Sequence, residues 1–123
     1  MRLEHIALNV PDIQALIAWY VGHLGFTIIR GEQVAPFKTF LGTDDRGVML
    51  ELYSNPAAPI PDYVRQDPTV FHLGFVVSVA RSEKFRLAEA GASFVSETTT
   101  RDGTILLMMR DPWGIPLQLC QRH

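Results

Sequence analysis

The stretch "HIALNV" (His5 to Val10) returns as "HLGFVV" (His72 to Val77) after an offset of 67 residues. Apolar side chains recur at every second position in both stretches, which is the spacing of a strand that buries one face. Each stretch is followed by a segment in which apolar residues recur at helical spacing. Because a repeat of this length is best explained as a structural unit used twice, the sequence predicts a duplicated module.

A second pair of stretches repeats at the same offset. "LEL" (Leu50 to Leu52) matches "LQL" (Leu117 to Leu119), so that Glu51 corresponds to Gln118. In both halves the histidine precedes the acid or amide by 46 residues. Glu51 lies in an otherwise apolar run, where an ionised carboxylate costs several kcal/mol unless a cation or hydrogen bonds compensate it. The repeat therefore predicts that Glu51 has a partner elsewhere in the chain.

Each half of the chain has the pattern strand, helix and three strands, separated by glycine and short polar turns. The strands are expected at 3–10, 26–30, 34–41, 48–53, 70–77, 93–99, 104–109 and 115–121, and the helices at 12–25, where Asp12 is a plausible cap, and at 82–90. We predict an α+β fold in a single domain, 1–123, made of two tandem βαβββ modules. Module one covers about 1–54 and module two about 70–123, with a proline-rich linker over about 55–69.

Strand alternation assigns the side chains of the repeated strands to two faces. One face is entirely apolar and should meet the helices: Ile6, Leu8, Leu50, Leu52, Leu73, Phe75, Val77, Leu117 and Leu119. The other face mixes polar, small and ligand-type side chains: His5, Ala7, Asn9, Met49, Glu51, Tyr53, His72, Gly74, Gln118 and Cys120. Such a mixture is unlike a core, so the second face is the candidate functional site.

Composition limits the classes of partner. The net charge is −2, and no basic stripe favours nucleic acid or acidic lipid. The single cysteine, Cys120, excludes an internal disulfide framework and fits a reducing compartment. No leader and no apolar run of about 20 residues is present, so a membrane segment is not expected. We therefore expect a cytoplasmic protein whose partners are small molecules, with no nucleic acid and no membrane.

Four motifs carry a family resemblance over nearly the whole chain: "LEHIALNVPDIQALIAWYVGHLGF", "VMLELYSN", "FHLGFVV" and "RDPWGIPLQL". They resemble the vicinal oxygen chelate superfamily, which includes glyoxalase I, extradiol dioxygenases, methylmalonyl-CoA epimerase and the fosfomycin and bleomycin resistance proteins. The resemblance implies that the sheets curl and that two modules form a cup around a divalent metal. Its ligands would be His5, Glu51, His72 and Gln118, the four positions that the repeat also selects.

Two imidazoles and one carboxylate suit Zn, Ni, Co, Mn or Fe(II), and they leave coordination positions for vicinal oxygens of a substrate. Gln118 departs from the family, because glyoxalase I and the dioxygenases that this chain resembles have glutamate there. An amide binds a metal more weakly and cannot act as a base, so Glu51 is the remaining candidate catalytic base. The resemblance thus implies a metal-dependent lyase or isomerase of the glyoxalase type acting on a small oxygen-rich substrate.

Two other functions fit the same sequence. One is a metal-free protein that binds or sequesters a ligand, as bleomycin resistance proteins do. The other is a dioxygenase-like oxidoreductase. The resemblance also implies a homodimer, because the cups of this family commonly combine modules of different subunits. The sequence leaves open whether the modules pair within one chain or across two.

Overall fold

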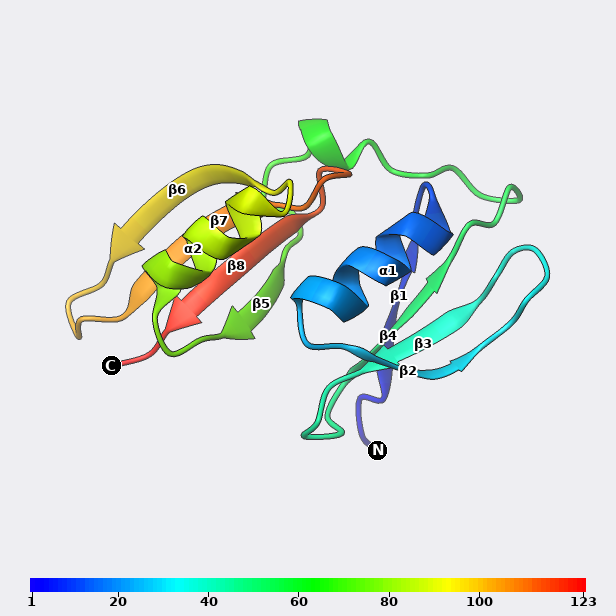
Figure 1. Ribbon diagram of the computed structural model, residues 1–123, viewed down its shortest axis with the longest axis horizontal. Coiled ribbons are helices and arrows are strands. Elements are labelled where there is room, and N and C mark those ends of the chain that lie inside the picture. Colours follow the sequence, from blue (N-terminus) through cyan, green and yellow to red (C-terminus); the bar gives the residue numbers. More distant parts are fainter. The chain divides into compact units, whose positions relative to one another are not determined.

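The first four-stranded sheet is built from residues near the start of the chain (Figure 1). Its elements are β1 (His5–Asn9), α1 (Ile13–His23), β2 (Thr27–Gly31), β3 (Thr39–Gly42) and β4 (Met49–Tyr53). The strand order is β1-β4-β3-β2, in which β1 and β4 run parallel and the other neighbours antiparallel. α1 lies across one face of this sheet and buries Ile13, Leu16, Trp19 and Tyr20.

The second sheet repeats this topology. After the short 3-10 helix η1 (Tyr63–Arg65), its elements are β5 (Leu73–Val76), α2 (Ala80–Glu89), β6 (Ser93–Thr99), β7 (Ile105–Arg110) and β8 (Pro116–Gln121). The strand order is β5-β8-β7-β6, again with one parallel pair, β5 and β8. α2 packs on β6, β7 and β8, and its first N–H group, that of Ala80, donates to Gln121 Oε1 at 2.9 Å.

The computed structural model describes residues 1–123, which divide into two units, Met1–Pro61 and Asp62–His123. Each unit has the order strand, helix and three strands. The predicted α+β fold with two βαβββ modules is therefore confirmed. No helix in either unit has the length and apolar character needed to cross a bilayer.

The predicted apolar face forms much of the core of each unit. Six leucines on this face are buried: Leu8, Leu50, Leu52, Leu73, Leu117 and Leu119. Burial of one such side chain stabilises the fold by about 1.5–3 kcal/mol. Ile6 differs, with 40% of its surface exposed, and it lies on β1, an edge strand of its sheet.

Two predicted strands begin three or more residues later than expected. The strand predicted at 34–41 starts at Thr39, because the backbone turns before it: Phe37 N donates to Val34 O at 2.8 Å, and Phe37 has a φ of 59°. The strand predicted at 70–77 starts at Leu73, so that His72 directly precedes β5. Residues in left-handed backbone end regular extended structure, and side-chain alternation alone does not reveal them.

Arg110 fixes the segment around η1 to the sheet of the second unit. Its guanidinium donates to Tyr63 O at 2.8 Å, to Gln66 O at 2.7 Å and to Gly114 O at 3.0 Å. Hydrogen bonds from a charged donor are stronger than neutral ones. Part of the predicted linker 55–69 is thus ordered against β7.

Candidate metal site

His5 and Glu51 come together on adjacent parallel strands of the first unit. Ala7 is paired with Glu51 across the β1–β4 ladder, and His5 lies two residues before Ala7, so His5 and Glu51 share one face. His5 Nε2 is 3.6 Å from Glu51 Oε2. Their side chains are 37% and 16% exposed, respectively, so a small ion or ligand has access to both.

The second contact of His5 indicates which of its two ring nitrogens donates a hydrogen bond. His5 Nδ1 lies 2.8 Å from Glu4 Oε1, and a carboxylate oxygen accepts, so Nδ1 carries the proton. In a neutral ring the lone pair is then on Nε2, the nitrogen that faces Glu51. Two ligand atoms at metal-bond distance from one tetrahedral ion are roughly 3.3 Å apart. The spacing of His5 Nε2 and Glu51 Oε2 is close to this value, so the pair fits a shared divalent ion.

The second unit presents the matching pair in the same backbone register. Gly74 is paired with Gln118 across the β5–β8 ladder, and His72 lies two residues before Gly74. His72 Nδ1 donates to Pro68 O at 2.8 Å, which again leaves the lone pair on Nε2, because a carbonyl oxygen only accepts. A histidine whose Nδ1–H is held by an acceptor is typical of metal ligands.

Gln118 has a neutral oxygen that can still act as a ligand. Its Oε1 accepts a hydrogen bond from Cys120 Sγ at 3.4 Å, and an amide oxygen has a second lone pair. Cys120 is buried and unpaired with any other cysteine, as expected for a packed thiol. The thiol therefore orients the amide and leaves one acceptor position.

The four predicted ligands are divided between the two units. His5 and Glu51 belong to Met1–Pro61, and His72 and Gln118 belong to Asp62–His123. The structure contains no group of three or more His, Cys, Asp or Glu side chains that could hold a metal ion. What it shows is a histidine and an acid or amide at equal register in each unit, pairs that are called half-sites below, and the four-residue metal site remains a prediction.

Alternation places Asn9 on the site face, but its side chain is used in hydrogen bonds to the backbone of a loop. It is buried; its Nδ2 donates to Asn55 O and Ala58 O, both at 3.0 Å, and its Oδ1 accepts from Asn55 N at 2.7 Å. These bonds satisfy the backbone of the loop after β4. Asn9 is thus a residue that anchors a loop, and the candidate site is limited to the other end of β1.

An aromatic ring and a guanidinium continue the site face across the sheet. Phe40, the ladder partner of Glu51, meets the His5 ring edge to face, with a distance of 5.5 Å between the ring centroids. Arg30, the ladder partner of Phe40, holds its guanidinium carbon 4.5 Å from the centroid of the same ring. Simple alternation along β2 does not place Arg30 on this face, so the sequence pattern predicts no role for it.

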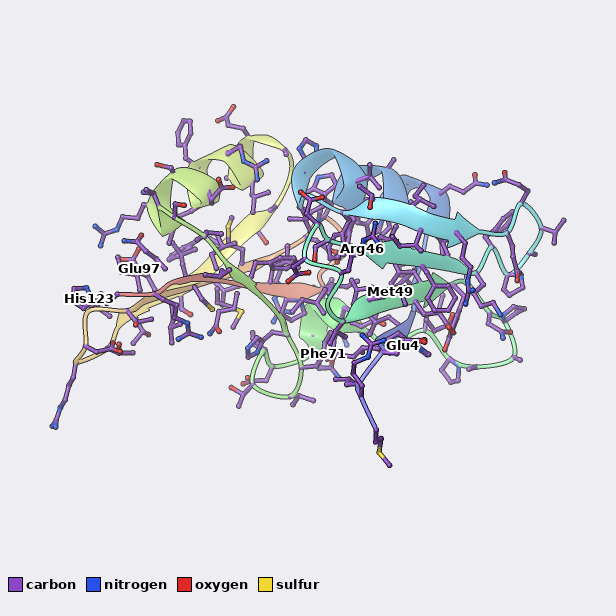
Figure 2. The ribbon with its side chains drawn as sticks, turned by 90° about the horizontal axis from the view of Figure 1, so that it is seen from below. Glu4, Arg46, Met49, Phe71, Glu97 and His123 are labelled. Carbon is purple, nitrogen blue, oxygen red and sulfur yellow. The ribbon has the colours of Figure 1, made fainter.

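A cavity of about 410 Å³ lies at the end of the first sheet; His5 and Glu51 do not line it themselves, but neighbours of His5 do. Glu4, Arg46 and Met49 line it together with Arg2, and Figure 2 shows the three labelled residues close to one another. Met49 is the ladder partner of His5, and Glu4 holds the His5 ring. Space for a small molecule is therefore present next to the first half-site.

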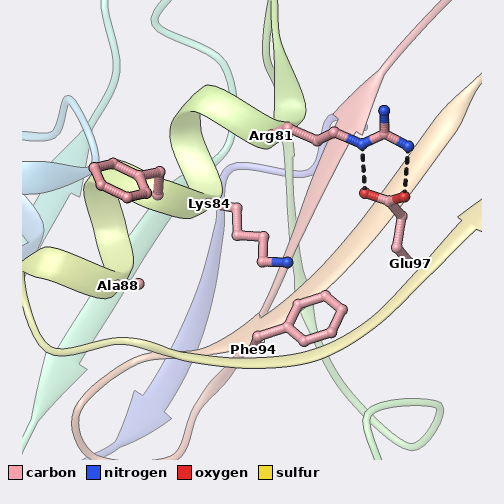
Figure 3. A pocket seen from close by; sticks show the side chains of 6 residues that line it. Arg81, Lys84, Ala88, Phe94 and Glu97 are labelled. Carbon is pink, nitrogen blue, oxygen red and sulfur yellow. Dashed lines mark hydrogen bonds and ion pairs between the residues drawn. The ribbon is translucent and has the colours of Figure 1, made fainter.

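A separate pocket of about 400 Å³ lies between α2 and β6 of the second unit (Figure 3). Arg81 donates from Nε and Nη2 to Glu97 at 3.1 and 2.8 Å. These bonds lower the pKa of the Glu97 carboxyl and raise the pKa of Arg81. Lys84 Nζ lies 3.7 Å from the centroid of the Phe94 ring. Neither His72 nor Gln118 lines this pocket, so it is distinct from the predicted metal site.

Two βαβββ units that carry matching half-sites define a class of protein, and comparison with known families identifies it. Residues 2–119 match the family model described as the Glyoxalase/Bleomycin resistance protein/Dioxygenase superfamily, and the chain belongs to this superfamily. The family predicted from the four motifs is thus confirmed.

Individual relatives match this chain over nearly its whole length, but at low sequence identity. The chain is 27% identical over 128 aligned residues to lactoylglutathione lyase of Salmonella typhimurium, covering 98% of this chain and 93% of the relative. A glyoxalase family protein from Enterococcus faecalis has 26% identity and a TM-score of 0.74, covering 98% of this chain and 97% of that one. A glyoxalase family protein from Bacillus cereus has the same fold, with 18% identity, a TM-score of 0.81 and coverage of 98% and 93%.

Proposed function

We propose that this protein is a divalent-metal-dependent lyase or isomerase that acts on a small substrate bearing vicinal oxygens. One observation carries the proposal. In each unit a histidine, His5 or His72, has its Nδ1 held by a hydrogen-bond acceptor. Each histidine lies two residues before the strand residue that pairs with Glu51 or Gln118. A histidine that is fixed in this tautomer offers Nε2 to a cation. Membership of the superfamily supports the same class of function.

The donor set suits a borderline divalent ion. His5 and His72 would supply neutral nitrogens, Glu51 a negative oxygen, and Gln118 a neutral oxygen. When bound, the metal would polarise the vicinal oxygens of the substrate as a Lewis acid. The partial exposure of Glu51 and the cavity beside Met49 leave room for that substrate on the first unit.

Glu51 would also move the proton. Because Gln118 is an amide, Glu51 is the only carboxylate among the four proposed ligands, and a base must accept a proton within hydrogen-bond reach of the substrate. The lactoylglutathione lyase relative supports a lyase of this type. We place the substrate of this chain in the wider class of small oxygen-rich molecules.

We also propose that the protein forms a homodimer. Each unit has edge strands, β1 and β2 in the first and β5 and β6 in the second, and a second chain can cover such edges. Sedimentation at low micromolar concentration tests this proposal: a dimer is expected, and a mass near 13.8 kDa contradicts it.

The enzymatic proposal is tested with tag-free protein that is stripped of metal and reloaded separately with Zn, Ni, Co, Mn or Fe(II). Turnover is measured with lactoylglutathione and with a panel of small 2-oxo and 2-hydroxy acids. We expect activity that chelation removes and reloading restores, and that Glu51→Gln abolishes. The matched control is Glu32→Gln, which removes an exposed carboxylate from the same unit and should leave turnover unchanged.

Two results would count against the enzyme. Turnover that survives Glu51→Gln would exclude Glu51 as the base. Ligand binding that survives exhaustive chelation, with no turnover by any reloaded form, would favour the metal-free binding proteins of the same superfamily.

A further inference from the structure

Arg30 carries a positive charge on the site face of the first unit. The ladder pairs Ala7 with Glu51, Glu51 with Phe40 and Phe40 with Arg30, so one row crosses all four strands. The guanidinium carbon lies 4.5 Å from the centre of the Phe40 ring. A cation over an aromatic face is held at a defined height while its N–H groups remain available to an anion.

A β-bulge brings Arg30 to this face. The pairing of β2 with β3 shifts between Ile28, the partner of Leu41, and Arg30, the partner of Phe40. In a regular strand, positions 28 and 30 would point to the same face, because alternation has a period of two. Ile28 instead lines a pocket with Gln14 and Ile17 of α1, while Arg30 contacts Phe40 on the opposite face. Bulges of this kind re-aim a side chain next to a functional site.

The second unit has the same bulge without the charge. Its pairing shifts between Phe94 and Ser96, and Ser96 is the partner of Met108, which is the partner of Gln118. Ser96 therefore occupies the place in the second row that Arg30 has in the first. The bulge belongs to the repeated fold, whereas the guanidinium is specific to one unit.

No ion pair within the first unit includes Arg30. The ion pairs of the structure involve other residues, and Lys38, the other cation of the β2–β3 hairpin, pairs with Glu32 at 3.8 Å. Arginine presents a planar fork that matches a carboxylate with two parallel hydrogen bonds. An exposed guanidinium held over a ring beside the proposed metal ligands therefore suits an anionic part of the substrate.

We propose that Arg30 binds a second carboxylate of the substrate, distal to the vicinal oxygens, so that the substrate class is a dicarboxylic 2-oxo or 2-hydroxy acid. This inference rests on the proposed metal-dependent function. Neighbouring strands are about 4.8 Å apart, and the guanidinium lies over Phe40, one strand from Glu51. Arg30 is therefore placed to reach a second carboxylate that a short chain joins to the vicinal oxygens, as in a five-carbon diacid.

Cobalt-loaded protein tests this assignment with a matched pair of probes. 2-Oxoglutarate and 2-oxopentanoate share the 2-oxo acid group and the five-carbon chain, and they differ only in a terminal carboxylate or methyl group. Dissociation constants are measured by titration calorimetry, and the visible cobalt spectrum reports contact with the metal. The variants are Arg30→Gln and, as the control, Lys38→Gln, which removes an equal charge from the same hairpin.

We expect the unmodified protein and Lys38→Gln to bind 2-oxoglutarate at least about tenfold more tightly than 2-oxopentanoate, because a carboxylate–arginine contact is lost with the second probe. Arg30→Gln should bind the two probes equally, while both still change the cobalt spectrum. Equal binding by the unmodified protein, or a preference that survives in Arg30→Gln, overturns the assignment and leaves the metal function standing. Protein that binds no cobalt overturns both.

Discussion

Glu4 Oε1 accepts a hydrogen bond from His5 Nδ1 at 2.8 Å, and this contact directs His5 Nε2 to Glu51. In the second unit a backbone carbonyl, Pro68 O, has the same role for His72. The two units thus fix the same tautomer with different acceptors. A charged carboxylate accepts a stronger hydrogen bond than a neutral carbonyl does, so we expect His5 to depend more strongly on its acceptor than His72 does.

Replacing Glu4 tests the role of this acceptor. In Glu4→Ala the His5 ring loses its hydrogen-bond partner, and loss of such an outer contact typically weakens metal binding by about 10–100-fold. The measurement is a competition titration of zinc against a chromogenic chelator. Glu32→Ala removes another exposed carboxylate of the first unit and should leave the affinity unchanged. An affinity in Glu4→Ala equal to that of the parent would show that the His5 contact does not support metal binding.

Gln118→Glu tests the amide that departs from the family pattern. A carboxylate at this position adds a negative ligand, so we expect tighter zinc binding and a second group able to accept a proton. The same competition titration gives the affinity, and the pH dependence of zinc binding shows whether a further ionisation contributes. Unchanged affinity would mean that the side chain of Gln118 does not reach the metal.

Gly114 allows β8 to begin close to η1. Its φ is 93°, and a Cβ atom there would lie 2.4 Å from Val64 Cγ2 and 2.8 Å from the backbone nitrogen of Val64. Gly114→Ala therefore combines backbone strain with overlap, and we expect it to lower the free energy of unfolding by about 2–5 kcal/mol. Gly22→Ala is the matched control: it lies within α1 with open space around it, so it should raise stability by about 0.5–1 kcal/mol. Urea unfolding measures both changes, and a Gly114→Ala protein as stable as the parent would contradict the contact with Val64.

Asp102 provides a pH-dependent test of the turn between β6 and β7. The Thr100 hydroxyl, followed by the Thr104 N–H, lowers the pKa of the Asp102 carboxyl from 3.8 to about 2. Because this pKa is depressed in the folded state, the carboxylate stabilises the fold above about pH 4, and this contribution is lost as the pH falls from about 4 to about 2. We expect Thr100→Val to raise the pKa toward 3.8 in an NMR titration, whereas Thr98→Val leaves it near 2. An unchanged pKa in Thr100→Val would exclude the hydroxyl as the cause.

Much of the fold followed from the sequence, because the offset between the histidines also relates the strands. The matching stretches at His5 and His72 indicated the duplicated module. The leucines beside Glu51 and Gln118 indicated which face of each sheet is buried. Strand starts were less predictable where the backbone leaves the extended region, as at Phe37. Alternation describes side chains and carries no information about a left-handed residue.

The site was predictable only in part. The spacing identified His5 and Glu51, which the structure brings within 3.6 Å. It did not identify Arg30, because a bulge changes the face of every residue that follows it and leaves no mark in the composition of the strand. It also placed Asn9 on the site face without showing that Asn9 holds the loop around Asn55. Hydrogen bonds between distant segments are set by tertiary structure.

The most direct test is the amount of divalent metal bound by tag-free protein after equilibrium dialysis, measured by elemental analysis. We predict about one ion per chain for the parent and for His123→Ala, which removes an exposed terminal imidazole. His5→Ala and His72→Ala should each lose the ion while remaining folded. No bound metal in the parent, or full occupancy in His72→Ala, would contradict the assignment of the two half-sites to one metal centre.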